Sequence, residues 1–243
     1  MRHFMRSLAG IVLSGLVASA NALPIADSVA DFSSIQGGNG WSYGYFNAGA
    51  APGASYTTGA FVAFDTFSAV DNRWEASAAQ VGAANNVYLS INANGGHTNG
   101  IGPDAQDSII WAMRRYTSAF AGAVDVDYLL RKANISNTNA GGITGHLFVD
   151  GVELLDQFIA NADGTGVQGT FSVLLNVGSV IDLAIDPEGL ATSRDPSVFS
   201  ARADGTDFSA VIRTATIPEP GVALLLLAAL PGLRARRRAR PAA

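Results

Sequence analysis

The chain has 243 residues, of which 15 are basic and 20 acidic, a net charge of −5 at neutral pH, and no cysteine. The lack of cysteine excludes a disulfide framework, a thiolate metal site and a thiol nucleophile. Seven arginines lie in the two terminal segments, so the body between them has 8 basic and 19 acidic residues and a charge near −11, which disfavours nucleic acid as a partner.

The first 22 residues have the order of a secretory signal peptide. Arg2 and Arg6 form a basic start, residues 8–18 are apolar, and Ala20 and Ala22 are the small residues of a cleavage site. We therefore expect cleavage after Ala22 and export of the body, residues 23–216, through the inner membrane. The alternative is an uncleaved N-terminal anchor, which the short apolar stretch disfavours.

Short β-strands are predicted throughout the body. Residues 124–130 alternate apolar and polar side chains with a period of two, which is typical of a half-buried strand. Asp150-Gly151 supplies the positive φ values that a tight hairpin turn needs, and residues 176–179 predict a second hairpin. The strands expected on these grounds are 41–46, 60–67, 87–91, 109–116, 124–130, 147–149, 152–154, 171–175, 180–185 and 208–214.

These strands predict an all-β fold with one domain, a single jelly-roll β-sandwich. A body of this length buries a core without covalent staples, and neither a linker nor a repeated unit divides it. A short helix within residues 71–84 has only alanine content in its favour, and the polar loop 92–100 is expected to be a solvated connector or a binding loop.

Three features follow one another at the C-terminal end, in residues 217–243. Pro218, Glu219 and Pro220 precede an apolar run at 222–233, and an arginine cluster follows at 234–240. Arginine is costly to move through hydrocarbon, so this order predicts a hydrophobic sorting helix held by a positive cytoplasmic stop. The run contains Pro231-Gly232 and is shorter than the roughly 20 residues that a spanning helix needs, which favours a transient association with the inner membrane.

This order of parts resembles the PEP-CTERM sorting tail of Gram-negative bacteria. The resemblance implies retention at the inner membrane, processing at or near Pro218, Glu219 and Pro220 by an exosortase-type enzyme, and a final location at the cell surface or outside the cell. The alternative is an amphipathic or aggregation-prone tail without a sorting role. The tail says nothing about the activity of the body.

The body carries a second resemblance, in the order of its turns and strands. An aromatic opening at 39–45 is followed by a strand that ends at Thr117-Ser118, a Gly-rich loop, the Asp150-Gly151 hairpin and Asp-rich turns near 182–187 and 195–199. This order is similar to the carbohydrate-binding-like, or galactose-binding-like, β-sandwich of exported bacterial proteins. The resemblance implies a module that in some relatives binds sugars, with a structural calcium ion in many of them.

The candidate ligand residues are aromatic and cationic. Trp41, Tyr43 and Tyr45 alternate along one strand and share one face, so they form either an aromatic platform for a pyranose ring or a part of the core. Arg114 and Arg115 point to opposite faces of their strand. One of them is therefore buried with a carboxylate partner or lies in a cleft, where Arg114 is our candidate to clamp a ligand.

A calcium site is a further expectation, because calcium prefers several hard oxygen ligands from a turn. The candidates are Asp182, Asp186, Glu188 and Asp195, or alternatively Asp163 with backbone carbonyls; the sequence predicts no other cofactor. His97 and His146 are the only histidines of the body, too few for a typical histidine-rich transition-metal site.

Three functions follow from these features. The first is a non-catalytic module that binds the exopolysaccharide of its own cell. The second is a structural matrix or adhesion protein without a small-ligand site. The third is a glycoside-active enzyme, which would need two facing carboxylates; Asp125 and Asp127 share a strand face, but their alternation with valines predicts a solvated surface. The sequence contains no Gly-x-Ser-x-Gly nucleophile elbow.

Overall fold

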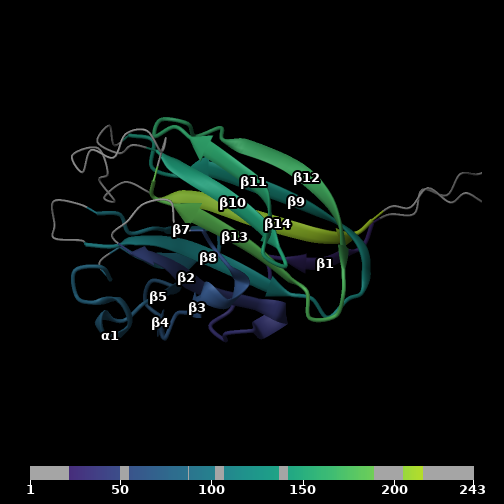
Figure 1. Ribbon diagram of the computed structural model, residues 1–243, viewed down its shortest axis with the longest axis horizontal. Coiled ribbons are helices and arrows are strands. Elements are labelled where there is room, and N and C mark those ends of the chain that lie inside the picture. Colours follow the sequence, from purple (N-terminus) through teal and green to yellow (C-terminus); the bar gives the residue numbers. More distant parts are fainter. Residues whose placement is uncertain are drawn as a thin grey trace, which may run out of the picture. The chain divides into compact units, whose positions relative to one another are not determined.

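The computed structural model describes residues 22–49, 55–86, 88–101, 107–136, 142–188 and 205–215. All of them from Leu23 on belong to one compact unit, Leu23–Ala215, in which two antiparallel sheets lie face to face (Figure 1). Both sheets and the core between them lie inside this unit, so we expect residues 23–215 to fold without the terminal segments. The all-β sandwich predicted from the strand pattern is confirmed; the predicted signal peptide and sorting helix lie outside the described residues.

The first sheet, sheet A, has the strand order β12-β9-β14-β7-β6-β5-β4, and β1 pairs with β14. Strand β9 is its longest, and pairs in continuous antiparallel register with β12 and β14. The bounds are β1 Pro24–Asp27, β4 Thr66–Ser68, β5 Arg73–Glu75, β6 Ser90–Asn92, β7 Gly95–His97, β9 Gly122–Lys132, β12 Val167–Leu175 and β14 Thr206–Thr214.

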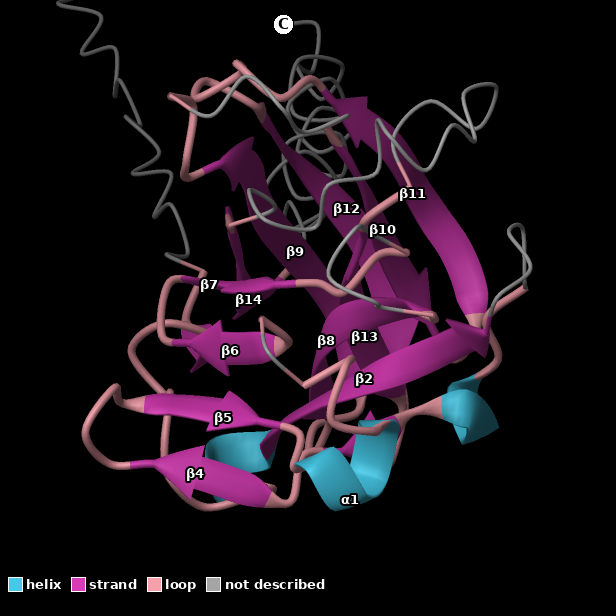
Figure 2. Ribbon diagram, turned by 90° about the vertical axis from the view of Figure 1, so that its left-hand side faces the viewer, coloured by secondary structure: helices cyan, strands magenta, loops and turns pink. Residues whose placement is uncertain are grey.

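The second sheet, sheet B, has the strand order β11-β10-β13-β8-β2-β3. Figure 2 shows β2, β8 and β13 side by side, as their pairing requires. The bounds are β2 Trp41–Gly49, β3 Val62–Ala63, β8 Ile109–Thr117, β10 Ile143–Val149, β11 Val152–Ile159 and β13 Val180–Asp186; the short helical turns are η1 Gly38–Gly40, η2 Thr58–Ala60 and α1 Ala78–Val81.

Alternating side chains build the core between the sheets. The inward residues of sheet A, among them Val124, Val126 and Ile212, are fully buried against inward residues of sheet B such as Ile110 and Ile181. Successive side chains of a strand point to opposite faces, so the period-two pattern read at 124–130 is what places these residues inside. In the described chain no helix is long and apolar enough to span a bilayer.

The two predicted hairpins have different outcomes. Strands β10 and β11 pair as expected, and Asp150 and Gly151 take φ values of 50° and 83° at the turn between them. The prediction of a second hairpin at 176–179 is wrong. Strand β12 pairs with β9 in sheet A, whereas β13 lies between β10 and β8 in sheet B. Residues 176–179 therefore carry the chain from one sheet to the other.

Further differences occur where strands are short. The strand expected at 60–67 is divided into β3 and β4, which belong to different sheets. The helix expected within 71–84 is a single turn, α1, and β5 occupies its first part. The loop 92–100 is not a solvated connector, because β7 lies in it and Asn99 forms a bridge with Ile110.

Close backbone contact explains why β7 begins with glycine. A Cβ atom on Gly95 would collide with the backbone of Thr206 and Asp207, the residues with which β7 pairs. Only glycine lets two strands approach this closely. The polar composition of 92–100 predicted a loop, but the same glycines allow the segment to join a sheet.

Candidate functional site

The aromatic row of β2 faces the core. Trp41 and Tyr43 have exposed fractions of 0% and Tyr45 one of 6%. The ring of Tyr43 packs against Phe32 and Trp74, with centroid distances of 4.8 and 6.3 Å, and no ring of the row presents a face to solvent. The Tyr43 hydroxyl and the Trp41 indole nitrogen have no hydrogen-bond partner among the described residues.

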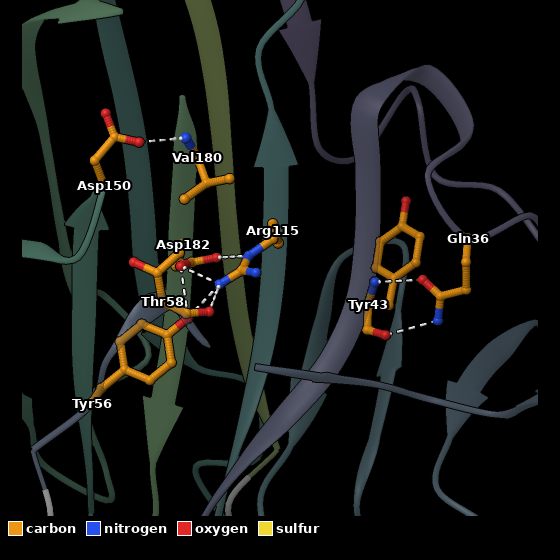
Figure 3. A network of polar contacts seen from close by, with 8 residues as sticks. All are labelled: Gln36, Tyr43, Tyr56, Thr58, Arg115, Asp150, Val180 and Asp182. Atoms are coloured by element: carbon orange, nitrogen blue, oxygen red, sulfur yellow. Dashed lines mark hydrogen bonds and ion pairs between the residues drawn. The ribbon is translucent and has the colours of Figure 1, made fainter. Parts of the chain in front are cut away.

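Gln36 holds the backbone of this row at Tyr43. The Gln36 amide accepts a hydrogen bond from Tyr43 N and donates one to Tyr43 O, both of 2.8 Å (Figure 3), and it also donates to Phe64 O. Phe64 N also donates to Tyr43 O, so Gln36 joins the backbones of Tyr43 and Phe64 just beyond the end of β3. The environment of the row is that of a structural element.

Arg114 is buried completely and has no carboxylate partner in the hydrogen bonds of the described chain. Its guanidinium donates to the carbonyl oxygens of Ser28 (2.8 Å), Asn92 (2.6 Å) and Gly95 (3.3 Å), and lies 4.7 Å above the ring of Phe208. Burial lowers the pKa of Arg114 to about 10, so it stays charged at neutral pH. These contacts join β8 of sheet B to segments of sheet A, and leave Arg114 buried away from any ligand in solution.

Arg115, the next residue, points to the outer face of sheet B and has the carboxylate partner. It donates from Nε to Asp182 Oδ1 (2.7 Å) and from Nη2 to Asp182 Oδ2 (2.9 Å), a two-pronged ion pair (Figure 3). The Tyr56 hydroxyl accepts from Arg115 (2.6 Å) and donates to Asp182 (2.7 Å), and Thr58 O accepts a further bond. All polar groups at the centre of this network are paired.

A second hydrophobic cluster surrounds this network on the outer face of sheet B. We call it the outer-face cluster; its buried members are Phe46, Tyr56, Ile109, Trp111, Met113, Phe148 and Ala184. The strands of sheet B contribute all of them except Tyr56, which lies in the segment before η2. The ring of Phe61 lies 4.3 Å from the Arg115 guanidinium. Residues 56–61 therefore cover part of a face that would otherwise expose large apolar side chains.

His146 lies at the margin of the outer-face cluster. Its ring stacks on Trp111 at 4.5 Å with an interplanar angle of 3°. Nδ1 lies 2.7 Å from Glu153 Oε1, and Nε2 lies 3.8 Å from Asp186 Oδ2. The Glu153 side chain is 42% exposed, whereas those of His146 and Asp186 are almost buried.

The two carboxylates change the protonation of the ring between them. Burial by itself would lower the pKa of His146, but the interactions with the carboxylates of Asp186 and Glu153 outweigh it and raise the pKa above its usual value. Burial also raises the pKa of Asp186, and the interaction with the nearby His146 ring opposes that increase only in part. The imidazole therefore gains a proton more readily here than in water.

Two polar atoms of this margin have no hydrogen-bond partner in the described chain. They are Nε2 of His146 and Nε1 of Trp111. Buried polar atoms are almost always paired, and those without a partner mark places where water or a ligand is accommodated. The neighbouring carboxylate of Glu153 is exposed, so it could accept hydrogen bonds from the hydroxyls of a sugar.

The residues proposed for calcium are not brought together. Asp182 is held by Arg115 and Tyr56, and Asp186 lies beside His146. Four residues along a strand separate two side chains by roughly 13 Å, too far for one ion. Asp195 lies outside the described residues, within which no group of three or more His, Asp or Glu side chains could hold a metal.

Sequence reasoning did not identify the His146 margin as a candidate site. Its side chains come from β8, β10, β11 and β13 and form no motif; only His146 and Glu153, on the β10–β11 hairpin, are close in the sequence. The one available signal was the alternation of β8, which places Trp111 and Arg115 on one face and Arg114 on the other. That alternation does not say which face the second sheet covers.

Comparisons with known proteins find similarity only to solved structures. No protein-family model matches the chain, and no curated protein matches it. Several of the similar structures are carbohydrate-binding modules. CBM51 from Clostridium perfringens GH95, in complex with methyl-galactose, is 13% identical with a TM-score of 0.30, and the match covers 49% of this chain and 79% of that one.

Two further matches have similarly low sequence identities and TM-scores. CBM35 from Paenibacillus barcinonensis is 15% identical with a TM-score of 0.23, covering 46% of this chain and 80% of that one. Beta-glucosidase from Kluyveromyces marxianus is 11% identical with a TM-score of 0.25, covering 44% of this chain and 12% of that one. At these TM-scores the similarities carry no argument about a ligand.

Proposed function

We propose that this chain is an exported, non-catalytic protein of the bacterial cell surface whose jelly-roll body binds polysaccharide. The observation that carries the binding proposal is the margin of the outer-face cluster, where His146 stacks on the Trp111 ring and faces the carboxylates of Glu153 and Asp186. Sugar sites combine aromatic surface with a few directed hydrogen-bonding groups. The terminal segments support export, transient membrane association and processing by an exosortase-type enzyme at Pro218, Glu219 and Pro220.

The polysaccharide would contact the exposed side of this margin. Glu153 and Asp156 are exposed, and Asp156 lies directly opposite His146 in the pairing of β10 with β11. Carboxylates accept hydrogen bonds from sugar hydroxyls, and a neutral or calcium-bridged polymer avoids repulsion by an acidic body. The exopolysaccharide of the same cell is our proposed ligand, because the protein would be delivered to that surface.

The test is a binding measurement on residues 23–215. We would measure retardation in gels that contain neutral, uronic or amino polysaccharides, with calcium and with a chelator. Retardation by one class, reduced at least tenfold in Glu153→Gln and unchanged in Asp125→Asn on the outer face of sheet A, is the expected result. Loss of retardation with chelator would indicate a calcium-bridged polymer as the ligand, whereas no retardation by any polymer would overturn binding.

A structural matrix or adhesion role is the second candidate, and the burial of the aromatic row favours it. Trp41, Trp74 and Trp111 are all at most 7% exposed, so the large rings act in packing. A glycoside-active enzyme has less support, because two catalytic carboxylates must face a substrate. Asp182 is engaged by Arg115, and both Glu153 and Asp186 face His146.

A further inference from the structure

Strand β12 is a long edge of sheet A. All nine of its residues pair with β9, from Val167 opposite Leu130 to Leu175 opposite Gly122. On its other side β12 has no partner strand among the described residues (Figure 1). A strand in this position presents a row of backbone N–H and C=O groups to whatever approaches it.

The composition of this edge lacks the usual protection against pairing. Strand β12 contains no charged residue and no proline, and its Leu174 is 72% exposed. Strand β11, the corresponding edge of sheet B, carries Glu153 and Asp156 on its exposed positions. Edge strands of monomeric proteins are commonly guarded by charges, prolines or bulges, and β11 shows both charges and a bulge opposite Leu147–Phe148.

The sequence of β12 is compatible with antiparallel pairing to itself. A two-fold axis at Phe171 places Thr170 of one copy opposite Ser172 of the other, and Gln168 opposite Leu174. Directly opposite residues in an antiparallel pair point to the same face, so the exposed residues of both copies remain on the outer face. The half-buried Phe171, stacked on Tyr128 at 5.4 Å, meets its own copy at the centre.

We propose that two copies of this chain associate through β12, joining their A sheets into one continuous sheet. The charge of the body supports this choice of surface, because two copies with a charge near −11 repel one another wherever carboxylates meet. The carboxylates nearest the edge, Asp125 and Asp127, are hydrogen-bonded to Ser172 and Thr170 on β12. An isologous contact of this kind closes as a dimer, and it is independent of any bound polysaccharide.

The experiment is sedimentation velocity on residues 23–215 over a wide concentration range. We expect a monomer–dimer equilibrium, a dissociation constant raised at least tenfold by Thr170→Lys, and no change in Ser209→Lys. Both positions lie on the outer face of sheet A, but Ser209 is on β14, away from the edge. Leu174→Lys, at a position 72% exposed, gives a second edge variant should Thr170→Lys unfold.

Hydrogen exchange locates the contact. Amides of residues 167–175 should exchange more slowly as the protein concentration rises, while those of β11 should not change. A body that stays monomeric at every concentration would overturn the proposal. A dimer that both edge variants leave intact, with slowed exchange elsewhere, would overturn it as well.

Discussion

The two outer faces of the sandwich are built in opposite ways. On sheet A, exposed polar side chains pair across strands: Ser172 donates to Asp125, Thr170 donates to Asp127, and Asp127 also pairs with Arg213. On sheet B, the outer face carries a second buried cluster, with the Arg115–Asp182 ion pair at its centre. The same alternation of side chains therefore gives a solvated surface on sheet A and a covered layer on sheet B.

Residues 56–61, which we call the covering segment, cause this difference between the two outer faces. Tyr56 lies over the outer face of sheet B and donates to Asp182 (Figure 3), and the ring of Phe61 lies against the Arg115 guanidinium. Once water is excluded, an ion pair gains strength from the low local dielectric, but its unpaired halves become costly. The burial of sheet B's outer face therefore predicts much larger effects of mutation there than on sheet A.

The largest effect is expected for Asp182→Ala. This change leaves the Arg115 guanidinium and the Tyr56 hydroxyl without their shared acceptor in a buried place, and removal of one partner of a buried pair costs about 3–5 kcal/mol. Denaturant unfolding of residues 23–215 measures it. The control Asp125→Ala, on the outer face of sheet A, should lose less than about 1 kcal/mol; equal losses would contradict the contrast between the faces.

The next effect is expected for Met113→Ala. Met113 has an exposed fraction of 0% in the outer-face cluster, and its truncation should lower the free energy of unfolding by about 2–5 kcal/mol. Leu174→Ala, at a 72% exposed position of sheet A, should change it by less than about 0.5 kcal/mol. A small loss for Met113→Ala would mean that the covering segment does not seal this face.

Much of the fold followed from the sequence, because strands are local features. The alternation at 124–130 and the Asp150-Gly151 turn predicted β9 and the β10–β11 hairpin. The partner of β12 could not be predicted from local patterns. Strand β12 pairs with β9 and not with β13, the next strand in the chain. Pairing is decided by which faces become buried together, and that depends on distant residues.

The candidate site was less predictable than the fold. Alternation correctly separated Arg114 from Arg115 and predicted a carboxylate partner or a cleft for one of them, but it could not tell which face the other sheet would cover. Arg115 obtained Asp182 as its partner, and Arg114 was buried among backbone carbonyls. The stack of His146 on Trp111 joins residues on β10 and β8, a contact that no local pattern records.

A pH effect is expected from His146. The pKa of His146 in the folded state is raised above the usual 6.5. The protonated ring therefore stabilises the folded state fully below pH 6.5, and this contribution is lost as the pH rises through the folded-state pKa. His146→Gln should therefore flatten the fall in the free energy of unfolding above pH 6.5. An unchanged slope in the variant would show that Glu153 and Asp186 do not hold the proton.

His97 provides the opposite case within the same molecule. Burial lowers the pKa of His97 to about 4, so the stability linked to it is present above pH 6.5 and is lost as the pH falls toward 4. His97→Gln should change only this acidic part of the curve, and His146→Gln mainly the part above pH 6.5. The two profiles, measured by urea unfolding at a series of pH values, separate the two histidines.

The smallest effect is expected for the exposed pair of Asp127 and Arg213 on sheet A. Their side chains are 32% and 43% exposed, so solvent and salt screen their attraction, and such pairs contribute about 0.2–1 kcal/mol. A double-mutant cycle with Asp127→Ala and Arg213→Ala measures the coupling energy, and added salt should reduce it. A coupling close to that of Arg115 with Asp182 would mean that burial is not what distinguishes the two faces, and the explanation would have to move from solvent exclusion to hydrogen-bond geometry.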